Sequence, residues 1–233
     1  MFGPKICVTD TETATMKGPI VDMAAVFIDE ELNEISRMES LIDPQCKIAP
    51  AAQAVHGISA EMVADAPTMA EYVELYGNPF SVEPGQQLII IGHNVQFDAR
   101  MYVQAGLLPT EYTKVCTLRM ARNLWPDLNE EEANHKLGTL AVMFDLETGP
   151  AHRAMGDVVT CLNLLKYIAD HTKIGSFTEL VALGTRALSL DTKITFGKHK
   201  GTKLKDLPSS YVSWLLGQPD MDPDLREALK ARG

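Results

Sequence analysis

Four carboxylates and one histidine lie in three short segments of this chain. Asp10 and Glu12 close an apolar run near the N-terminus, Asp98 follows a second apolar run, and His152 and Asp157 open a long helical pattern. Carboxylates gathered in one pocket repel one another and need cations between them, and oxygen ligands suit hard ions such as Mg²⁺ or Mn²⁺. Two such ions held a few ångströms apart form a common machinery for cleaving phosphodiester bonds. The five residues therefore predict a metal-dependent phosphodiesterase site.

The elements that carry these residues decide whether they can meet. Asp10 and Glu12 are two residues apart, so on a strand both side chains project from one face, at the end where open α/β sheets bind ligands. We expect Asp98 and Asp157 in the first turns of two helices, where the positive end of the helix dipole helps to keep an acid ionised. His152 precedes Asp157 by about one turn and can reach the same pocket as a mobile proton carrier.

Each cluster alone has an ordinary structural explanation. Strand ends collect acids, so a D-x-E pair is a weak signal, Asp98 could simply begin a helix, and His152 could be a partly exposed cap. All three clusters, in a compatible order and at strand ends or helix starts, are much harder to explain by structure alone. This combination favours a catalytic site.

Hydrophobic periodicity predicts an α/β fold, in which a mixed sheet is flanked by helices. A change in composition along the chain predicts a large domain (1–172), a connecting segment with a short helix (173–193) and a small Lys-rich hairpin-and-helix module (194–233), called here the C-terminal module. The predicted strands are 5–9, 20–29, 34–42, 87–92 and 114–116, with a hairpin of 194–196 and 202–204 in the module. The predicted helices are 60–65, 69–77, 95–105, 117–124, 136–144, 153–171, 177–188, 209–216 and 222–232.

Composition is that of a soluble globular protein, with 45% apolar residues and no apolar stretch near the ~20 residues that span a bilayer. We expect no targeting segment, and the four scattered cysteines without C-x-x-C spacing exclude a zinc module and favour a reducing, cytoplasmic location. The net charge of −10 argues against a nucleic-acid partner, but it is uneven. Residues 1–189 carry 13 Lys and Arg against 25 Asp and Glu, whereas residues 190–233 carry 8 against 6. Bound divalent ions would also reverse the local sign at the carboxylates, so acidity does not exclude DNA or RNA.

The three segments resemble the exonuclease motifs of the DEDDh (DnaQ-like) family, which are 3′→5′ exonucleases on a ribonuclease-H-like fold. The matching positions are Asp10 and Glu12, then Asp98, then His152 with Asp157, and the H-x-x-x-x-D spacing of the third motif marks the histidine-bearing branch. The main resemblance covers about residues 5–172, and a small module similar to the C-terminal one ends some members of the family. The additional similar segments are 54–58, 116–118, 134–138, 196–201, 207–208 and 211–216.

The resemblance implies an enzyme that uses two Mg²⁺ or Mn²⁺ ions to release nucleoside 5′-monophosphates from single-stranded or frayed DNA 3′ ends, in DNA repair or replication. Asp10, Glu12 and Asp157 would hold the first ion, which activates the attacking water. Asp10 and Asp98, the latter through water, would place the second ion beside the leaving 3′ oxygen. His152 would take the proton from the attacking water, because histidine titrates near neutral pH.

Six residues near the first two motifs are predicted to contact the substrate: Thr13, Ala14, Met16, Lys17, His56 and Asn94. The first pair would offer backbone groups to the terminal sugar. The second pair, in the adjoining turn, would pack against a terminal base and touch a phosphate, although a plain surface hairpin explains this turn equally well. The histidine and the asparagine would line the nucleotide pocket, or could instead satisfy loops by hydrogen bonding.

Lysines gather in the C-terminal module, at Lys193, Lys198, Lys200, Lys203 and Lys205. A solvated face is the common explanation for such a run, and the functional alternative is an auxiliary phosphate clamp. Trp214 lies at helical spacing with apolar neighbours, which predicts a place in the core of the module rather than a base-stacking platform.

Other functions stay open at this point. Within the same class, the chain could be an RNA-trimming 3′ exonuclease or a proofreading subunit that works inside a polymerase complex. From a different class, it could be a catalytically inactive adaptor that binds nucleic acid, which is disfavoured because every chemical position is filled. The sequence also leaves open a polymerase or repair partner and the choice between a monomer and a homodimer.

Overall fold

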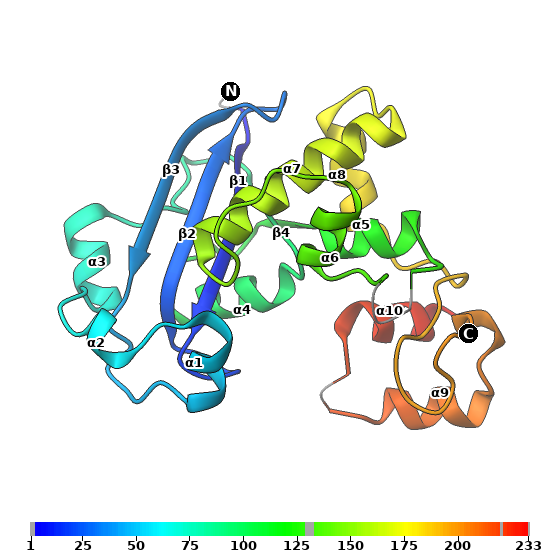
Figure 1. Ribbon diagram of the computed structural model, residues 1–233. Helices are drawn as coiled ribbons and strands as arrows, with labels where there is room; N and C mark the ends of the chain where they lie inside the picture. Colours follow the sequence, from blue (N-terminus) through cyan, green and yellow to red (C-terminus); the bar gives the residue numbers. More distant parts are fainter. Residues whose placement is uncertain (1–2, 129–132, 220, 233) are drawn as a thin grey trace.

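A five-stranded mixed sheet forms the centre of the molecule (Figure 1). The computed structural model describes residues 3–128, 133–219 and 221–232. β1, β2 and β3 form an antiparallel meander, and β4 and β5 run parallel to β1, so the α/β architecture predicted from the sequence is confirmed. In spatial order, the strands are β3 (Glu34–Leu41), β2 (Ile20–Ile28), β1 (Lys5–Thr13), β4 (Leu88–Gly92) and β5 (Thr113–Cys116).

β1 extends to Thr13, whereas the sequence pattern predicts its end at residue 9. Acidic residues are poor strand formers, but here the ladder to β2 keeps them extended, with Glu12 opposite Asp22. On its other side β1 pairs with β4 only as far as Val8 opposite Ile91. The acidic end of β1 therefore lies where two parallel strands stop pairing, which is the place where α/β sheets bind ligands.

Helices cover both faces of the sheet, and a separate apolar cluster lies between the sheet and the helices on each face. Ile6 and Val8 of β1 pack in the cluster that contains α7, whereas Cys7 packs in the cluster that contains α4. Alternate side chains of β1 therefore point to opposite layers. On the first face lie α5 (Thr117–Leu124), α6 (Leu137–Met143), α7 (Ala154–Thr172) and α8 (Phe177–Thr185), and on the second lie α3 (Met69–Tyr76) and α4 (Gln96–Gln104).

Two short helices, α1 (Pro50–His56) and α2 (Ala60–Val63), lie near the end of β1 (Figure 1). The sequence pattern does not indicate α1, which is too short to show a helical period. Its limits are set by proline in the first turn and by Gly57, which has a φ of 73° and ends the helix in the left-handed conformation.

The C-terminal module contains η1 (Leu204–Asp206), α9 (Ser209–Leu216) and α10 (Pro223–Ala231), which pack around an apolar cluster of their own beside α5 (Figure 1). The predicted hairpin forms in part: the chain folds back with a backbone hydrogen bond from Ile194 to Thr202, but one isolated bridge between residues 193 and 203 replaces the two strands. The chain between them forms successive turns that leave too few extended residues for a ladder.

α8 packs its apolar side into the cluster around α7, and the division of the chain at residues 172 and 193 stays a prediction. No helix in the described part of the chain has the length and apolar character needed to cross a bilayer.

Candidate active site

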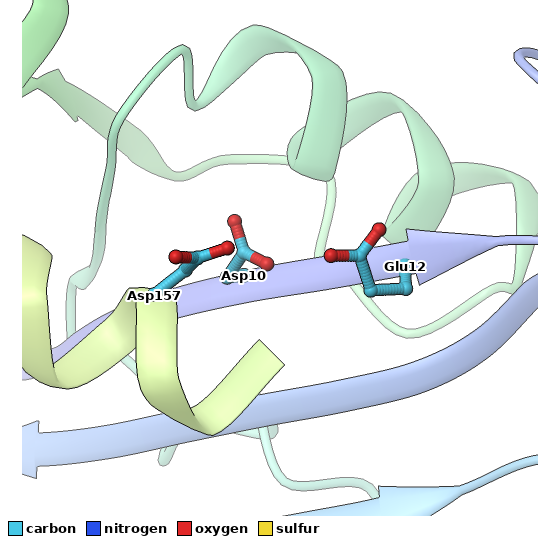
Figure 2. A group of neighbouring side chains, drawn as sticks. All are labelled: Asp10, Glu12 and Asp157. Atoms are coloured by element: carbon cyan, nitrogen blue, oxygen red, sulfur yellow. The ribbon is translucent and has the colours of Figure 1, made fainter. Parts of the chain in front are cut away.

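The carboxylates of Asp10, Glu12 and Asp157 meet beside β1 at the start of α7, as Figure 2 shows. Asp10 and Glu12 project from the same side of β1, and Asp157 reaches the same space from the first turn of α7. One oxygen from each carboxylate can be chosen so that all three oxygens lie within 4.8 Å of one another. These three residues are called the acidic cluster below. The structure thus brings together three of the four carboxylates singled out in the sequence.

A fifth acid, Asp22, holds the start of α7 in place. It lies opposite Glu12 on β2, is buried, and accepts a 2.8 Å hydrogen bond from Nε of Arg153 and a 3.4 Å hydrogen bond from the backbone N–H of Ala154. It therefore supplies a cap from another element to a helix whose own N-cap residue makes no side-chain cap. No sequence motif marks Asp22, because its role depends on the register between β1 and β2.

Gly156 explains how a loop can run across the start of α7. A Cβ atom at this position would lie 1.8 Å from the carbonyl oxygen of Pro150, so the backbone of the preceding loop occupies the space of a side chain. This close approach brings the segment before α7, including His152, to the same end of the helix as Asp157.

Asp98 approaches from the opposite layer, in the first turn of α4. It is only 2% exposed, and its Oδ1 accepts two 2.9 Å hydrogen bonds from Thr11, one from the backbone N–H and one from the hydroxyl. The structure does not place Asp98 within the acidic cluster, but its charge is close enough to affect Asp10. Thr11, which lies between Asp10 and Glu12 in the sequence, therefore fixes Asp98 against β1.

Burial raises the pKa values of Asp10, Glu12, Asp98 and Asp157, and repulsion from neighbouring carboxylates adds to the shift of the first three. Burial is the main cause for Asp10, whose pKa is raised well above its usual value, and the charges of Asp98, Asp157 and Glu12 add to it. Burial, with the charges of Asp157 and Asp22, raises the pKa of Glu12 to about 7. The pKa of Asp98 is raised to about 7 by burial, against the lowering effect of its hydrogen bonds from Thr11. The arrangement therefore favours partner cations.

His152 lies exposed on the rim, with a left-handed backbone φ of 60°. Burial raises the pKa of Asp157, and both the charge of His152 and a hydrogen bond from its backbone oppose that shift. His152 and the acids Asp10 and Asp157 line one cleft, which has a volume of about 950 Å³. The cleft is large enough for a nucleotide-sized ligand.

Two further histidines form part of the wall of this cleft. His93 donates from Nε2 to the carbonyl of His135 at 2.8 Å, which leaves its Nδ1 to accept from the hydroxyl of Thr117 at 3.0 Å. Burial lowers the pKa of His93 to about 4, so this ring is neutral at pH 7. It therefore joins the second motif to the start of α5 and to the loop before α6, and has a structural role at the cleft.

The predicted substrate residues nearest β1 are largely engaged within the protein. The backbone N–H of Ala14 donates to the carbonyl of Pro19, and its own carbonyl accepts from the backbone N–H of Ala49. Thr13 donates its hydroxyl to the carbonyl of Thr15. Backbone contacts from these two residues to a sugar stay a prediction, and those from Ala14 would have to share or replace existing bonds.

The remaining predicted contacts differ in exposure. His56 is buried, donates from Nε2 to the carbonyl of Thr13 at 3.3 Å, and accepts from the N–H of Ile58 at 3.0 Å, so it satisfies a loop. Met16 is 78% exposed and Lys17 is exposed on the neighbouring turn. Asn94 is exposed and has a φ of 75°. These residues are accessible to a substrate, except for His56, and their contacts stay predictions.

Comparison with known proteins identifies the family. The family model described as Exonuclease (RNase_T) matches residues 7–165, a span that contains the acidic cluster, Asp98 and His152. The chain belongs to the exonuclease family. Exodeoxyribonuclease 10 of Escherichia coli (strain K12) is 34% identical over 233 residues, which cover 96% of each chain, so this similarity continues into the C-terminal module. The resemblance found in the sequence is confirmed, and the protein is a nuclease.

Other comparisons agree with this assignment. The DNA polymerase III subunit epsilon of Treponema pallidum (strain Nichols) is 29% identical over 173 residues, which cover 70% of this chain and 76% of that protein. A solved structure of exonuclease X in complex with 5′ overhanging duplex DNA has a TM-score of 0.57 and 27% identity, and the match covers 76% of this chain and 99% of that chain. Residues 187–220 match a second model, QSregVF_b, described as "Putative quorum-sensing-regulated virulence factor".

Proposed function

We propose that this protein is a metal-dependent 3′→5′ exonuclease that removes nucleoside 5′-monophosphates from single-stranded or frayed DNA 3′ ends. The observation that carries the proposal is the acidic cluster in a cleft of about 950 Å³, with His152 on the rim of the same cleft. Two proteins similar to this chain support DNA as the substrate, namely exodeoxyribonuclease 10 and exonuclease X in complex with overhanging duplex DNA.

The donor set suits hard divalent cations. Three carboxylates with oxygens within 4.8 Å of one another repel at neutral pH, and a cation bound between them would remove that repulsion. Asp10, Glu12 and Asp157 would hold one Mg²⁺ or Mn²⁺ ion, and Asp10 with Asp98 would help to hold a second. Two bound ions would supply activation of the attacking water and neutralisation of charge on the leaving 3′ oxygen.

His152 is the group best placed to accept the proton of the attacking water. Its side chain is exposed on the rim of the cleft, so it can approach a bound phosphodiester and then release the proton to solvent. The neighbouring carboxylate of Asp157 would stabilise the imidazolium formed in this step, since the two charges already interact. Thr11 holds Asp98 in one orientation through two hydrogen bonds, so this acid would be fixed before substrate arrives.

The test is degradation of matched 5′-labelled single-stranded DNA and RNA, with Mg²⁺ and with EDTA, by the full chain and by the Asp10→Ala variant. We expect a metal-dependent ladder that shortens from the 3′ end of DNA and is absent with the variant. A ladder on RNA alone would replace the DNA assignment with RNA trimming. Binding of both nucleic acids without cleavage, by a protein that folds normally, would refute the nuclease proposal in favour of an adaptor.

Cellular context follows from the same proposal. A cytoplasmic location would give the enzyme access to chromosomal DNA ends, and the four free thiols are compatible with a reducing compartment. The similarity to a polymerase III epsilon subunit makes a polymerase partner a second arrangement to test, by measuring whether the isolated chain is active without one.

A further inference from the structure

A second cavity adjoins the cleft and extends from it toward the C-terminal module. Its volume is about 520 Å³, and it shares Arg122, His135 and Thr195 with the cleft that contains Asp10 and Asp157. We call this second cavity the side groove. Because three residues line both cavities, the side groove lies next to the cleft, within reach of a strand whose 3′ end is held at the acidic cluster.

Exposed aromatic side chains line the side groove. Trp214 is 55% exposed and Phe196 is 45% exposed, and both belong to the C-terminal module. The prediction that Trp214 lies in the core of the module is therefore wrong, because neighbouring residues of α9, such as Leu215, fill that core instead. The ring of Trp214 stacks on the ring of Tyr211, with 5.4 Å between centroids and 22° between planes, and this contact restrains its orientation. A supported and exposed aromatic face is suited to stacking with a nucleobase.

The module also brings positive charge to the cleft. Of the five clustered lysines, Lys193 pairs with Asp127 at 2.6 Å, and the ammonium groups of Lys203 and Lys205 both pair with Asp191, at 3.0 and 2.8 Å. The other two, Lys198 and Lys200, form no ion pair with the described residues, and Lys200 lines the cleft together with the acidic cluster. A lysine beside the path of a nucleic acid attracts its phosphates.

The loop that carries this lysine is held in a defined place. Gly197 has a φ of 70°, which favours glycine, and a Cβ atom there would lie 2.5 Å from the hydroxyl of Tyr211, so a larger residue would have to displace the end of that side chain. The module itself is joined to α5 by the buried ion pair of Arg119 with Asp224 and by Arg122 with Asp222 at 2.9 Å. The groove is therefore formed before any ligand binds, which lowers the entropic cost of binding.

We propose that the side groove binds the single-stranded segment 5′ of the two nucleotides joined by the bond that is cut, with a nucleobase stacked on Trp214 and a phosphate contacted by Lys200. The inference rests on the proposed function, because it takes the acidic cluster as the place where the 3′ end is cut. The adjoining position of the two cavities, the cation in the cleft and the exposed aromatic faces all match a polyanion that carries planar bases.

The experiment compares substrates that can and cannot reach the groove. The kcat/KM in Mg²⁺ is measured for a labelled dithymidylate and for a twelve-nucleotide oligothymidylate. The readout is the value for the twelve-nucleotide strand divided by the value for the dithymidylate. The full-length variants are Trp214→Ala, Trp214→Phe and Lys200→Ala. The matched controls are Lys198→Ala, which changes an unpaired lysine of the same loop that lines neither cavity, and Tyr76→Ala, which changes an exposed aromatic residue on α3.

We expect Trp214→Ala to lower the ratio by about 5-fold to 100-fold, the value of one lost base stack, and Trp214→Phe to restore most of it. Lys200→Ala should weaken binding of the longer strand and reduce its log–log salt slope by about 0.7, as expected for one phosphate contact to a single strand. The two controls should keep the wild-type ratio.

Three results would overturn the inference. The first is an unchanged ratio in the Trp214→Ala variant, whether both values stay at the wild-type level or both fall equally through damage to the cleft or the fold. The second is wild-type cleavage of the dithymidylate with no gain from a longer strand, which would refute the groove alone. The third is a wild-type protein that cleaves neither substrate, which would refute the proposed function as well, so the two failures are distinguishable.

Discussion

Replacing Asp10 by asparagine should make the metal-free protein more stable while it removes activity. Asp10 lies between Glu12 and Asp157 in the acidic cluster, and in the absence of metal these groups must carry their charges close together at alkaline pH. Asparagine has nearly the same shape, removes one charge, and can donate from its amide to the two remaining carboxylates. A cluster selected for cation binding, rather than for folding, should respond in this way.

The expected size follows from the distances in the cluster. For two unit charges whose oxygens lie at the outer limit of 4.8 Å, the Coulomb energy is about 0.9 kcal/mol in water and about 3.5 kcal/mol at an effective dielectric constant of 20. The cleft is open to solvent on one side, so we expect a net gain near the lower part of that range, about 2 kcal/mol for two relieved pairs. In a chain of this size, 2 kcal/mol corresponds to a rise in Tm of about 4–8 °C.

The effect has a definite pH dependence. The folded protein raises the pKa of Glu12 and of Asp98 to about 7, above the values of about 4 expected in the unfolded chain. Between these limits the folded state binds more protons than the unfolded state, so stability falls as the pH rises from about 4 to about 7. The advantage of Asp10→Asn should therefore be small at pH 5 and should grow as the pH rises to 8, where the carboxyl groups of the cluster lose protons.

Thermal unfolding in EDTA at the two pH values measures this, with Asp65→Asn as a control that changes an exposed aspartate away from the cluster. Addition of Mg²⁺ or Mn²⁺ at pH 8 should raise the Tm of the wild-type protein and have much less effect on Asp10→Asn. A lower Tm for Asp10→Asn in EDTA at pH 8 would show that the cluster supports the fold, and would refute the reasoning.

Other positions lead to further predictions. His152→Ala should lower kcat on a DNA oligonucleotide by about 10²-fold or more with an unchanged Tm, because the side chain is exposed, and near-wild-type activity would reject it as the base. Asp22→Asn should lower kcat by about tenfold or more with little change in KM, since it loosens the start of α7, and a change in KM alone would contradict a positioning role. Arg119→Ala should destabilise the protein in urea by about 3–5 kcal/mol, because it leaves Asp224 buried without its partner. Glu227→Ala, which removes the exposed partner of the same arginine, should change stability by less than about 1 kcal/mol, and equal effects of the two variants would reject the buried pair as the anchor of the module.

The sequence predicts where each acid of the cluster lies on its own strand or helix, because that placement is local. Two acids separated by one residue share a face of any strand, and an acid a few residues into a helical pattern lies in the first turn, whatever the rest of the fold does. The contacts that support the cluster are not local. Asp22 caps α7 only because β2 pairs with β1 in one register, and Thr11 binds Asp98 only because α4 crosses the opposite face of β1. A pattern within one segment carries no information about such partners.

The secondary structure shows the same contrast between features set within one segment and features set by distant contacts. Long periodic segments, such as α7 and the apolar strand β4, agree with the sequence prediction to within a few residues. α1 was missed and the hairpin of the module was overpredicted, because both are short and depend on how neighbouring segments hold them. Trp214 was assigned to a core from helical spacing, but spacing shows which residues share a face and not which face is buried.

Charge is the property that the sequence describes least well. The acidic total argues against binding of a polyanion, and the run of five lysines argues for it, but both sums treat every charge as free. In the folded chain three of those lysines are paired with aspartates, whereas Lys200 lies beside the cleft without an ion pair to the described residues. Asp10 and Asp157 of the acidic cluster line the same cleft, burial raises their pKa values, and such a cluster is neutralised when cations bind. Under the proposed function, attraction of a nucleic acid would depend on where each charge lies, and a cation at the cleft, such as Lys200, can outweigh the acidic total of the chain.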